Sequence, residues 1–173
     1  MKNIKNLIKP SIFNLTRIKD TMDNRYEFLG LDKNERLIPF DQYLLKKFIN
    51  SINDETISLY YELGELYALL AEYLNVKKSQ LLITAGSDLG IKSIYEACIL
   101  ENDHIVLHSP SFAMYEVYAN IFGAKYSKIS LNNNWHIDIS QMKKCINDCT
   151  KLFVIENPNG FVGTKPNKKE IYN

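Results

Sequence analysis

Two stretches in the first half of the chain carry apolar residues at helical spacing. Residues 41–52 begin with Asp41, a candidate N-cap. They place five apolar residues on one face, namely Leu44, Leu45, Phe48, Ile49 and Ile52. Residues 63–74 repeat the pattern with Leu63, Leu66, Tyr67, Leu70 and Leu74. We expect two amphipathic helices whose apolar faces pack against a core. Residues 1–30 show no sustained period and predict an irregular arm.

From residue 80 the pattern changes to short apolar runs that alternate with helical segments. The runs are residues 81–84, 104–109, 125–131 and 151–156. Short strands separated by helices predict parallel pairing through right-handed crossovers, with helices covering the sheet. The expected fold is therefore an α/β three-layer sandwich with a mostly parallel sheet. We assign residues 1–54 to an N-terminal arm and helix and residues 55–173 to the sheet domain.

Composition and charge exclude several classes of protein. The 173 residues are 46% hydrophobic and 24% charged, which is typical of a globular chain with one core. The net charge of +1 comes from 21 basic and 20 acidic residues mixed along the chain, so we expect no nucleic-acid partner. The opening residues lack the apolar run of a signal peptide or membrane span, which predicts a cytoplasmic protein without a membrane partner.

The three cysteines do not predict a disulfide or a metal site. An odd number of Cys in a chain without an export signal favours reduced thiols. Cys145 and Cys149 lie one helical turn apart and could form half of a metal site, but no second pair or nearby His completes it. We therefore expect no metal.

Ligands in parallel sheets bind at the carboxyl ends of the strands, so the loops that begin at Thr84, Ser109 and Glu156 are the candidates. After Thr84, the small residues Ala85, Gly86 and Ser87 permit a sharp turn, and Ser87 or Asp88 can cap the next helix. Free N–H groups at that helix start would hold a phosphate. Ordinary helix capping explains the same residues.

The loop after Ser109 places Phe112 just inside the predicted helix. Its ring could face a planar ligand, and Tyr115 and Tyr118 follow in the same region. Aromatic residues at this spacing are more often part of a core. The position of Phe112 at a strand end is what favours a ligand contact there.

Five segments, in order, resemble the fold type I pyridoxal-phosphate enzymes, and within them the histidinol-phosphate aminotransferase-like branch. The resemblance runs from about Leu31 to the last residue. It is carried by "LDKNERLIPF", "YYELGELYALLAEYLNV", "ITAGSDLGI", "SPSFAMYEVYANIFGA" and "ENPNGFVGT", which are similar to the family's "LDxNENP", "YP…L…LAxYLGV", "xGxGSDExI", "xPxYxxYxxxAxxxGA" and "NPNNPTG". It implies an incomplete large domain of a PLP-dependent transferase, with pyridoxal 5'-phosphate as cofactor, a small-molecule amino donor and acceptor, and a homodimer.

The resemblance also implies a role for individual residues. The backbone amides of a turn would bind the cofactor phosphate; the turn consists of Ala85, Gly86, Ser87 and Asp88. Phe112 would stack on the pyridine ring, and Asn34 would lie near the substrate. Tyr60 would reach across the homodimer interface to the neighbouring subunit's phosphate, although Tyr61 stands where the family has Pro.

The segment "NPNGFVG" departs from the family pattern. Gly160 stands where the family has the Asn that donates to the phenolic oxygen of the cofactor, and Phe161 replaces the second Pro. A hydrogen bond to a charged oxygen is worth roughly 1.5–3 kcal/mol. Either Asn159 supplies the donor after a loop shift, which Gly160 would permit, or cofactor binding is weaker.

The family's Schiff-base Lys, its Asp at the pyridine nitrogen and its substrate-binding Arg come later in the chain than "NPNNPTG". No Lys of this sequence lies in a matching motif. We therefore expect the N-terminal portion of an aminotransferase, inactive by itself and without catalytic residues of its own. A sheet cut after its first strands would expose an edge, so we expect an oligomeric or poorly soluble chain.

Two alternatives remain open. The chain could be a non-catalytic truncated protein or binding module that retains a phosphate half-site, which Gly160 favours. It could also be an unrelated nucleotide binder of the Rossmann type, but the glycine-rich turn of that fold is absent from the sequence.

Overall fold

The computed structural model of the protein describes residues 8–13, 15, 24, 27–31, 33–166 and 168–172. The chain divides into two compact units, each described here by itself. One consists of residues 17–81, and the other combines residues 1–16 with residues 82–173. The sequence places a domain boundary between residues 54 and 55, which stays a prediction.

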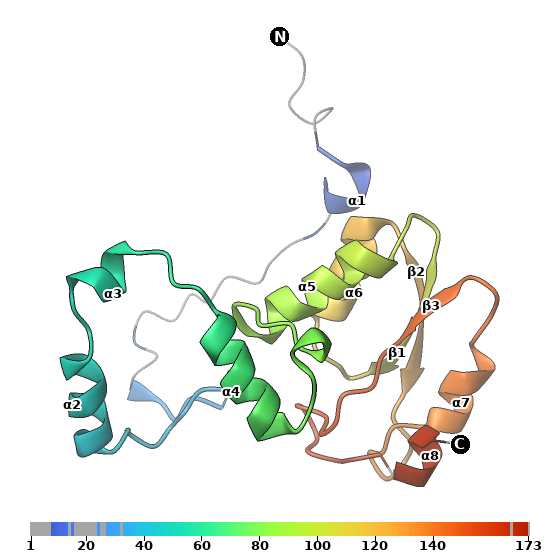
Figure 1. Ribbon diagram of the computed structural model, residues 1–173. Coiled ribbons are helices and arrows are strands. Elements are labelled where there is room, and N and C mark those ends of the chain that lie inside the picture. The colour runs from blue at the N-terminus through green and yellow to red at the C-terminus, as the bar shows by residue number, and fades with distance from the viewer. Residues whose placement is uncertain are drawn as a thin grey trace. The chain divides into compact units, whose positions relative to one another are not determined.

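The unit of residues 82–173 is built on a sheet of three parallel strands (Figure 1). These are β1 (His104–Ser109), β2 (Lys125–Ser130) and β3 (Thr150–Phe153), in the order β2-β1-β3. His104 of β1 pairs with Lys125 and with Thr150, and the register to β3 shifts after His104. The structure confirms the parallel strands predicted at residues 104–109, 125–131 and 151–156, within a few residues at their ends.

Helices cover both faces of this sheet, as Figure 1 shows. Ile105 and Leu107 of β1 face the core shared with α5 (Gly86–Cys98) and α6 (Met114–Phe122). Val106, between them, faces the other core, which contains Met142 of α7 (Ile139–Lys144). Because β1 is apolar on both faces, it forms the buried centre of the sheet. The predicted three-layer α/β sandwich is confirmed.

The strand predicted at residues 81–84 is wrong for the described residues. Leu81 has extended backbone angles, φ −113° and ψ 140°, but residues 81–84 belong to no sheet. A strand needs a neighbour for its N–H and C=O groups, and the three described strands pair only with one another. Leu82 is accordingly 67% exposed.

The unit of residues 17–81 contains α2 (Gln42–Asn50), α3 (Asp54–Ser58), α4 (Gly64–Leu74) and the 3₁₀ helix η3 (Lys78–Gln80). Asp41 is the N-cap of α2, as predicted, and accepts from the N–H groups of Tyr43 and Leu44 at 3.0 Å. A capping box of Asn53 and Thr56 begins α3, which the sequence pattern did not predict. Two short helices complete the described elements, α1 (Pro10–Phe13) and α8 (Lys168–Tyr172), and both belong to the other unit.

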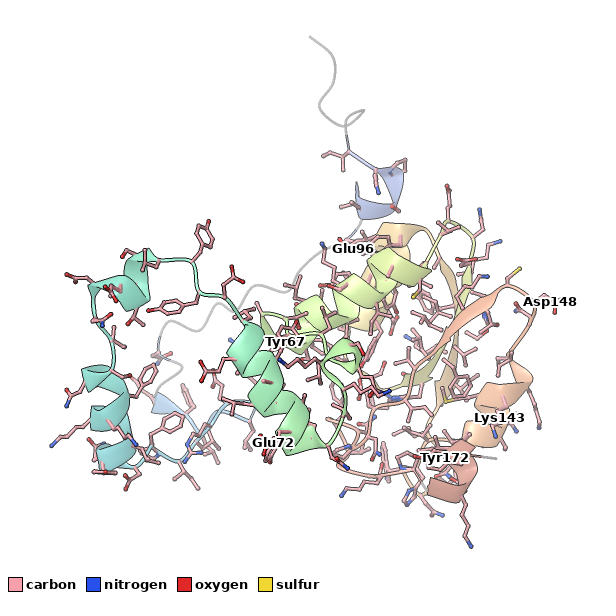
Figure 2. All side chains as sticks on the ribbon, in the orientation of Figure 1. Tyr67, Glu72, Glu96, Lys143, Asp148 and Tyr172 are labelled. Carbon is pink, nitrogen blue, oxygen red and sulfur yellow. The ribbon has the colours of Figure 1, made fainter. Side chains whose placement is uncertain are left out.

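The apolar face of α2 and most of that of α4 remain exposed, although Tyr67 and Leu70 are half-buried, so the prediction that these faces pack against a core is wrong for the described residues. No residue of α2 is buried, and Phe48 is 65% exposed. In α4 only Ala71 is buried, and Leu66 of the predicted face is 44% exposed. The side chains of both helices are drawn in Figure 2. No helix in the described part of the chain has the length and hydrophobicity required to span a bilayer.

Candidate active site

Three predicted ligand-facing segments lie in the unit of residues 82–173. They are the turn at residues 84–88, the loop at residues 110–113 and the loop at residues 157–163. Strands β1 and β3 are parallel neighbours, so the loops that follow them leave the same edge of the sheet. The turn at residues 84–88 begins α5, which packs on α6.

The turn at residues 84–88 presents backbone donors. Helix α5 begins at Gly86, whose φ is +80°, and its N-cap Ala85 makes no side-chain cap bond. Gly86 N donates to Thr84 O, and Thr84 Oγ1 donates to Gly86 O, both at 2.8 Å. The N–H groups of Ser87 and Asp88 donate to no described residue. A 13-residue helix with free N–H groups at its start suits a phosphate.

Ser87 and Asp88 do not cap α5, contrary to the sequence-based expectation, because both lie inside its first turn. Asp88 instead accepts a hydrogen bond from the Tyr118 hydroxyl of α6 at 2.8 Å. Burial of Tyr118, followed by its hydrogen bond to Asp88, raises the pKa of this hydroxyl to about 12. The Asp88 side chain is thus engaged with α6, and the turn offers its backbone to a ligand.

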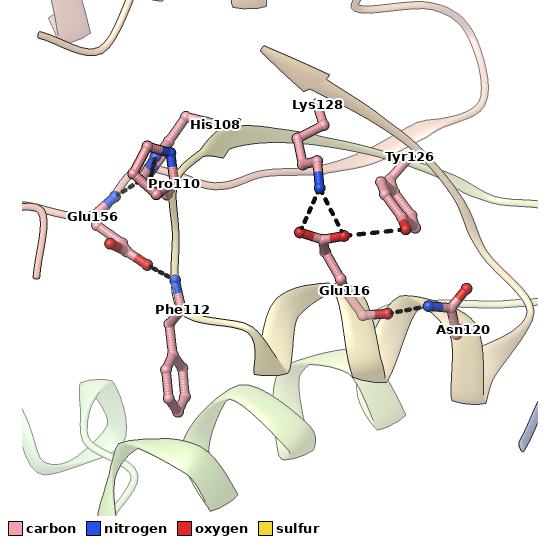
Figure 3. Close-up of polar contacts among 8 residues, drawn as sticks. All are labelled: His108, Pro110, Phe112, Glu116, Asn120, Tyr126, Lys128 and Glu156. Carbon is pink, nitrogen blue, oxygen red and sulfur yellow. Dashed lines mark hydrogen bonds and ion pairs between the residues drawn. The ribbon is translucent and has the colours of Figure 1, made fainter. Parts of the chain in front are cut away.

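Phe112 lies two residues before α6 begins at Met114, rather than inside the helix as predicted. Its ring is 41% exposed and meets the ring of Tyr115 edge-on, with centroids 6.2 Å apart and planes at 89°. Figure 3 shows the Phe112 side chain pointing away from the strands. This ring can therefore stack on a planar ligand, whereas Tyr118 belongs to the buried core.

The buried Asn159 side chain holds the loop at residues 157–163 together through its hydrogen bonds. Its side chain is 1% exposed, and Nδ2 donates to Pro110 O at 2.9 Å. Its Oδ1 accepts from the N–H groups of Phe161 at 2.8 Å and Val162 at 3.1 Å. A shift that turned Asn159 toward a ligand would break these bonds, so the geometry favours the weaker-binding alternative. Gly160 is exposed, and a Cβ added there would meet nothing within 4 Å.

His108 links the two loops, and the sequence reasoning did not select it. Its side chain is 1% exposed, and Nε2 accepts from the N–H of Glu156 at 3.1 Å. Nδ1 therefore carries the hydrogen and donates to Pro110 O at 3.1 Å. Burial lowers the pKa of His108, against the opposing effects of the Glu156 charge and the bond to Pro110. The sequence contained one sign of this role, since His108 is a polar residue near the end of an apolar strand.

The two remaining predicted residues, Tyr60 and Asn34, belong to the unit of residues 17–81. Both side chains are exposed, and that of Tyr60 is completely so. An exposed tyrosine is available to another molecule, as the predicted contact across a dimer requires. Their roles stay predictions.

Comparison with known protein families shows the family of this chain. Residues 27–173 match the family described as Aminotransferase class I and II, which is most of the chain. The chain belongs to this family. The fold, the resemblance in five segments and the helix-start turn at residues 84–88 agree with that assignment.

Several relatives of this chain are histidinol-phosphate aminotransferases. The enzyme of Caldicellulosiruptor saccharolyticus is 35% identical over 84% of this chain, and that of Clostridium kluyveri is 26% identical over 83%. In both cases the match spans only 42% of the relative's own length.

Solved structures show the same fold at lower identity. Tyrosine aminotransferase from Leishmania infantum aligns with a TM-score of 0.65 and 19% identity, covering 75% of this chain and 39% of that one. Alanine aminotransferase from Pyrococcus furiosus aligns with a TM-score of 0.63 and 24% identity, covering 74% and 34%.

Class I and II aminotransferases use pyridoxal 5'-phosphate, which has a phosphate, a pyridine ring and a phenolic oxygen. The described residues fit the phosphate and the ring. The free N–H groups of Ser87 and Asp88 suit the phosphate. The partly exposed ring of Phe112 suits the pyridine ring. Among the described residues, the phenolic oxygen has no donor that matches the family pattern, because Gly160 lacks a side chain and the Asn159 side chain is hydrogen-bonded within the loop.

Proposed function

We propose that this chain is the N-terminal part of a pyridoxal 5'-phosphate-dependent aminotransferase. The enzyme would move an amino group between an amino acid and a phosphorylated or sugar-like acceptor. The observation that carries the proposal is the helix start at Gly86, with its free N–H groups and positive φ, in a chain of this family. We further propose a cytoplasmic homodimer, in which Tyr60 contacts the phosphate of the neighbouring subunit.

Each residue of the proposed site has a binding role. The turn of residues 85–88 would hold the phosphate through its free N–H groups, those of Ser87 and Asp88, assisted by the positive end of the α5 dipole. Phe112 would cover one face of the ring and exclude water from it, and Asn34 would contact the substrate. When bound, pyridoxal phosphate supplies an electron sink for the bonds of the amino acid's α-carbon.

The nucleophilic Lys and the Asp at the ring nitrogen have no match in this sequence. The chain spans less than half the length of the curated relatives described above. We propose that both groups belong to a longer protein. The second candidate is a non-catalytic protein that keeps only the phosphate half-site, and the loss of a donor at Gly160 favours it. Intact mass of the native protein separates them, since a mass of 20.1 kDa would support the second candidate.

Ligand affinity tests the phosphate site. Pyridoxamine 5'-phosphate is the suitable probe, because it has no aldehyde to react with surface Lys, and pyridoxamine is its phosphate-free counterpart. Isothermal titration should show at least roughly tenfold tighter binding of the phosphorylated form, since charge-assisted hydrogen bonds are strong. Equal affinity for the two compounds would contradict the proposal.

A glycine pair supplies matched variants for this test. Gly86 and Gly64 both begin a helix, and a Cβ at either meets nothing within 4 Å, but only Gly86 has a positive φ. Gly86→Ala should strain the turn by about 1–2 kcal/mol and weaken binding of the phosphorylated probe. Gly64→Ala should leave that affinity unchanged. Wild-type affinity in the Gly86 variant would place the phosphate elsewhere.

A further inference from the structure

The Glu156 carboxylate joins the two loops at the ends of β1 and β3. Its Oε1 accepts a hydrogen bond from the backbone N–H of Phe112, which is 44 residues away in the chain (Figure 3). Its Oε2 accepts a longer hydrogen bond from the N–H of Gly160, with 3.4 Å between the nitrogen and the oxygen. One side chain thus contacts the backbone of both loops.

The backbone of Glu156 is fixed by a second connection to the same loop. Its N–H donates to Nε2 of His108, and Nδ1 of His108 donates to Pro110 O, two residues before Phe112. Glu156 also lies near Tyr115, whose pKa is raised first by burial and then by the Glu156 carboxylate. These hydrogen bonds therefore hold the Glu156 carboxylate beside the segment that carries Phe112.

We propose that Glu156 is a positioning residue that holds the Phe112 ring in place for a planar, phosphorylated ligand. The inference rests on the proposed function and adds a residue to it. Phe112 precedes α6 and its ring is partly exposed, so packing alone leaves the ring free to change its orientation. The bond from its N–H to a charged acceptor restrains the backbone that carries the ring, and such bonds are about twice as strong as neutral ones.

The test is a double-mutant cycle in the protein at its native length, with pyridoxamine 5'-phosphate as the probe. Phe112→Ala should weaken binding roughly tenfold through lost stacking. Glu156→Ala should weaken it by a similar factor. The double variant should bind no more weakly than Phe112→Ala, because Glu156 acts through the ring. Inorganic phosphate should bind all of these variants equally well, a result that a general loss of structure would not produce.

Glu116 supplies the matched control. It is a carboxylate of the same unit and accepts from Lys128 Nζ and the Tyr126 hydroxyl, with no described bond to either loop (Figure 3). Glu116→Ala removes the same charge and should leave affinity for the probe within about twofold, since long-range charge effects are screened. Glu156→Gln keeps an oxygen that can accept from the Phe112 N–H but loses the charge, so it should lose less affinity than Glu156→Ala. If Glu156→Ala does not fold, the Gln variant takes its place in the cycle.

The outcomes separate the two proposals. Additive losses in the double variant, or wild-type affinity in Glu156→Ala, would overturn the positioning role while leaving the phosphate site intact. A Gln variant as weak as the Ala variant would also overturn it, because an oxygen that can still accept from the Phe112 N–H would then restore no affinity. A wild-type protein that does not bind the probe would overturn both the role and the proposed function.

Discussion

The turn at residues 84–88 and the loop at residues 157–163 differ in the groups that they present. The first presents backbone N–H groups, and its one charged side chain, Asp88, is bound to Tyr118. The second depends on side chains, and its buried Asn159 is used to hold the loop itself. Backbone donors survive many substitutions as long as Gly86 keeps its φ, whereas a single change at residue 160 removes a side-chain donor.

The largest effect should come from removing the side chain that closes the second loop. Asn159→Ala leaves the N–H groups of Phe161 and Val162 without their acceptor, and Pro110 O keeps only the donor from His108. We expect a loss of about 2–4 kcal/mol in the free energy of unfolding, measured by urea denaturation, because unsatisfied buried groups are costly. Asn134→Ala is the control, since that exposed side chain makes no described hydrogen bond. Equal losses in the two variants would show that Asn159 does not hold the loop.

The sheet could be predicted from sequence because its signals are local and its core is contained in the chain. Ile105, Val106 and Leu107 form a short apolar run a few residues before Pro110, and β1 contains that run. The N-cap at Asp41 was equally local, because a cap depends on groups two or three residues away. Both predictions required no knowledge of distant parts of the chain.

Features that depend on distant partners could not be predicted in the same way. Residues 81–84 have the composition of a strand, but a strand exists only beside another, and no described strand pairs with them. The link from Glu156 to Phe112 joins residues 44 positions apart, so sequence spacing contains no sign of it. Asn159 was identified as a site residue, yet only the structure shows that its amide is already occupied.

A smaller effect should follow from restoring the family's side chain at the second loop. Gly160→Asn supplies the missing donor, and a Cβ there meets nothing within 4 Å, so the fold should accept it. We expect up to about tenfold tighter binding of pyridoxamine 5'-phosphate, measured by titration calorimetry. Gly160→Ala adds a Cβ without a donor and should leave the affinity unchanged. Identical affinities in the Asn and Ala variants would place the phenolic oxygen away from residue 160.

The smallest effect concerns pH and the imidazole that joins the two loops. Burial lowers the pKa of His108 in the folded protein below its ordinary value of 6.5. The unfolded chain therefore binds a proton at a higher pH than the folded chain does. The stability that His108 contributes is present above pH 6.5 and is lost as the pH falls from there through the lower folded pKa.

Urea unfolding at pH 7.5 and at about pH 5.5 measures this loss, because carboxylates titrate mostly below that range. His108→Gln cannot be protonated and should show a smaller difference between the two pH values than the wild type. His136→Gln is the matched control, because His136 is exposed and lies outside both loops, and it should keep the wild-type difference. If both variants keep that difference, the pH dependence arises from other groups, and the neutral imidazole between Glu156 and Pro110 adds nothing to stability.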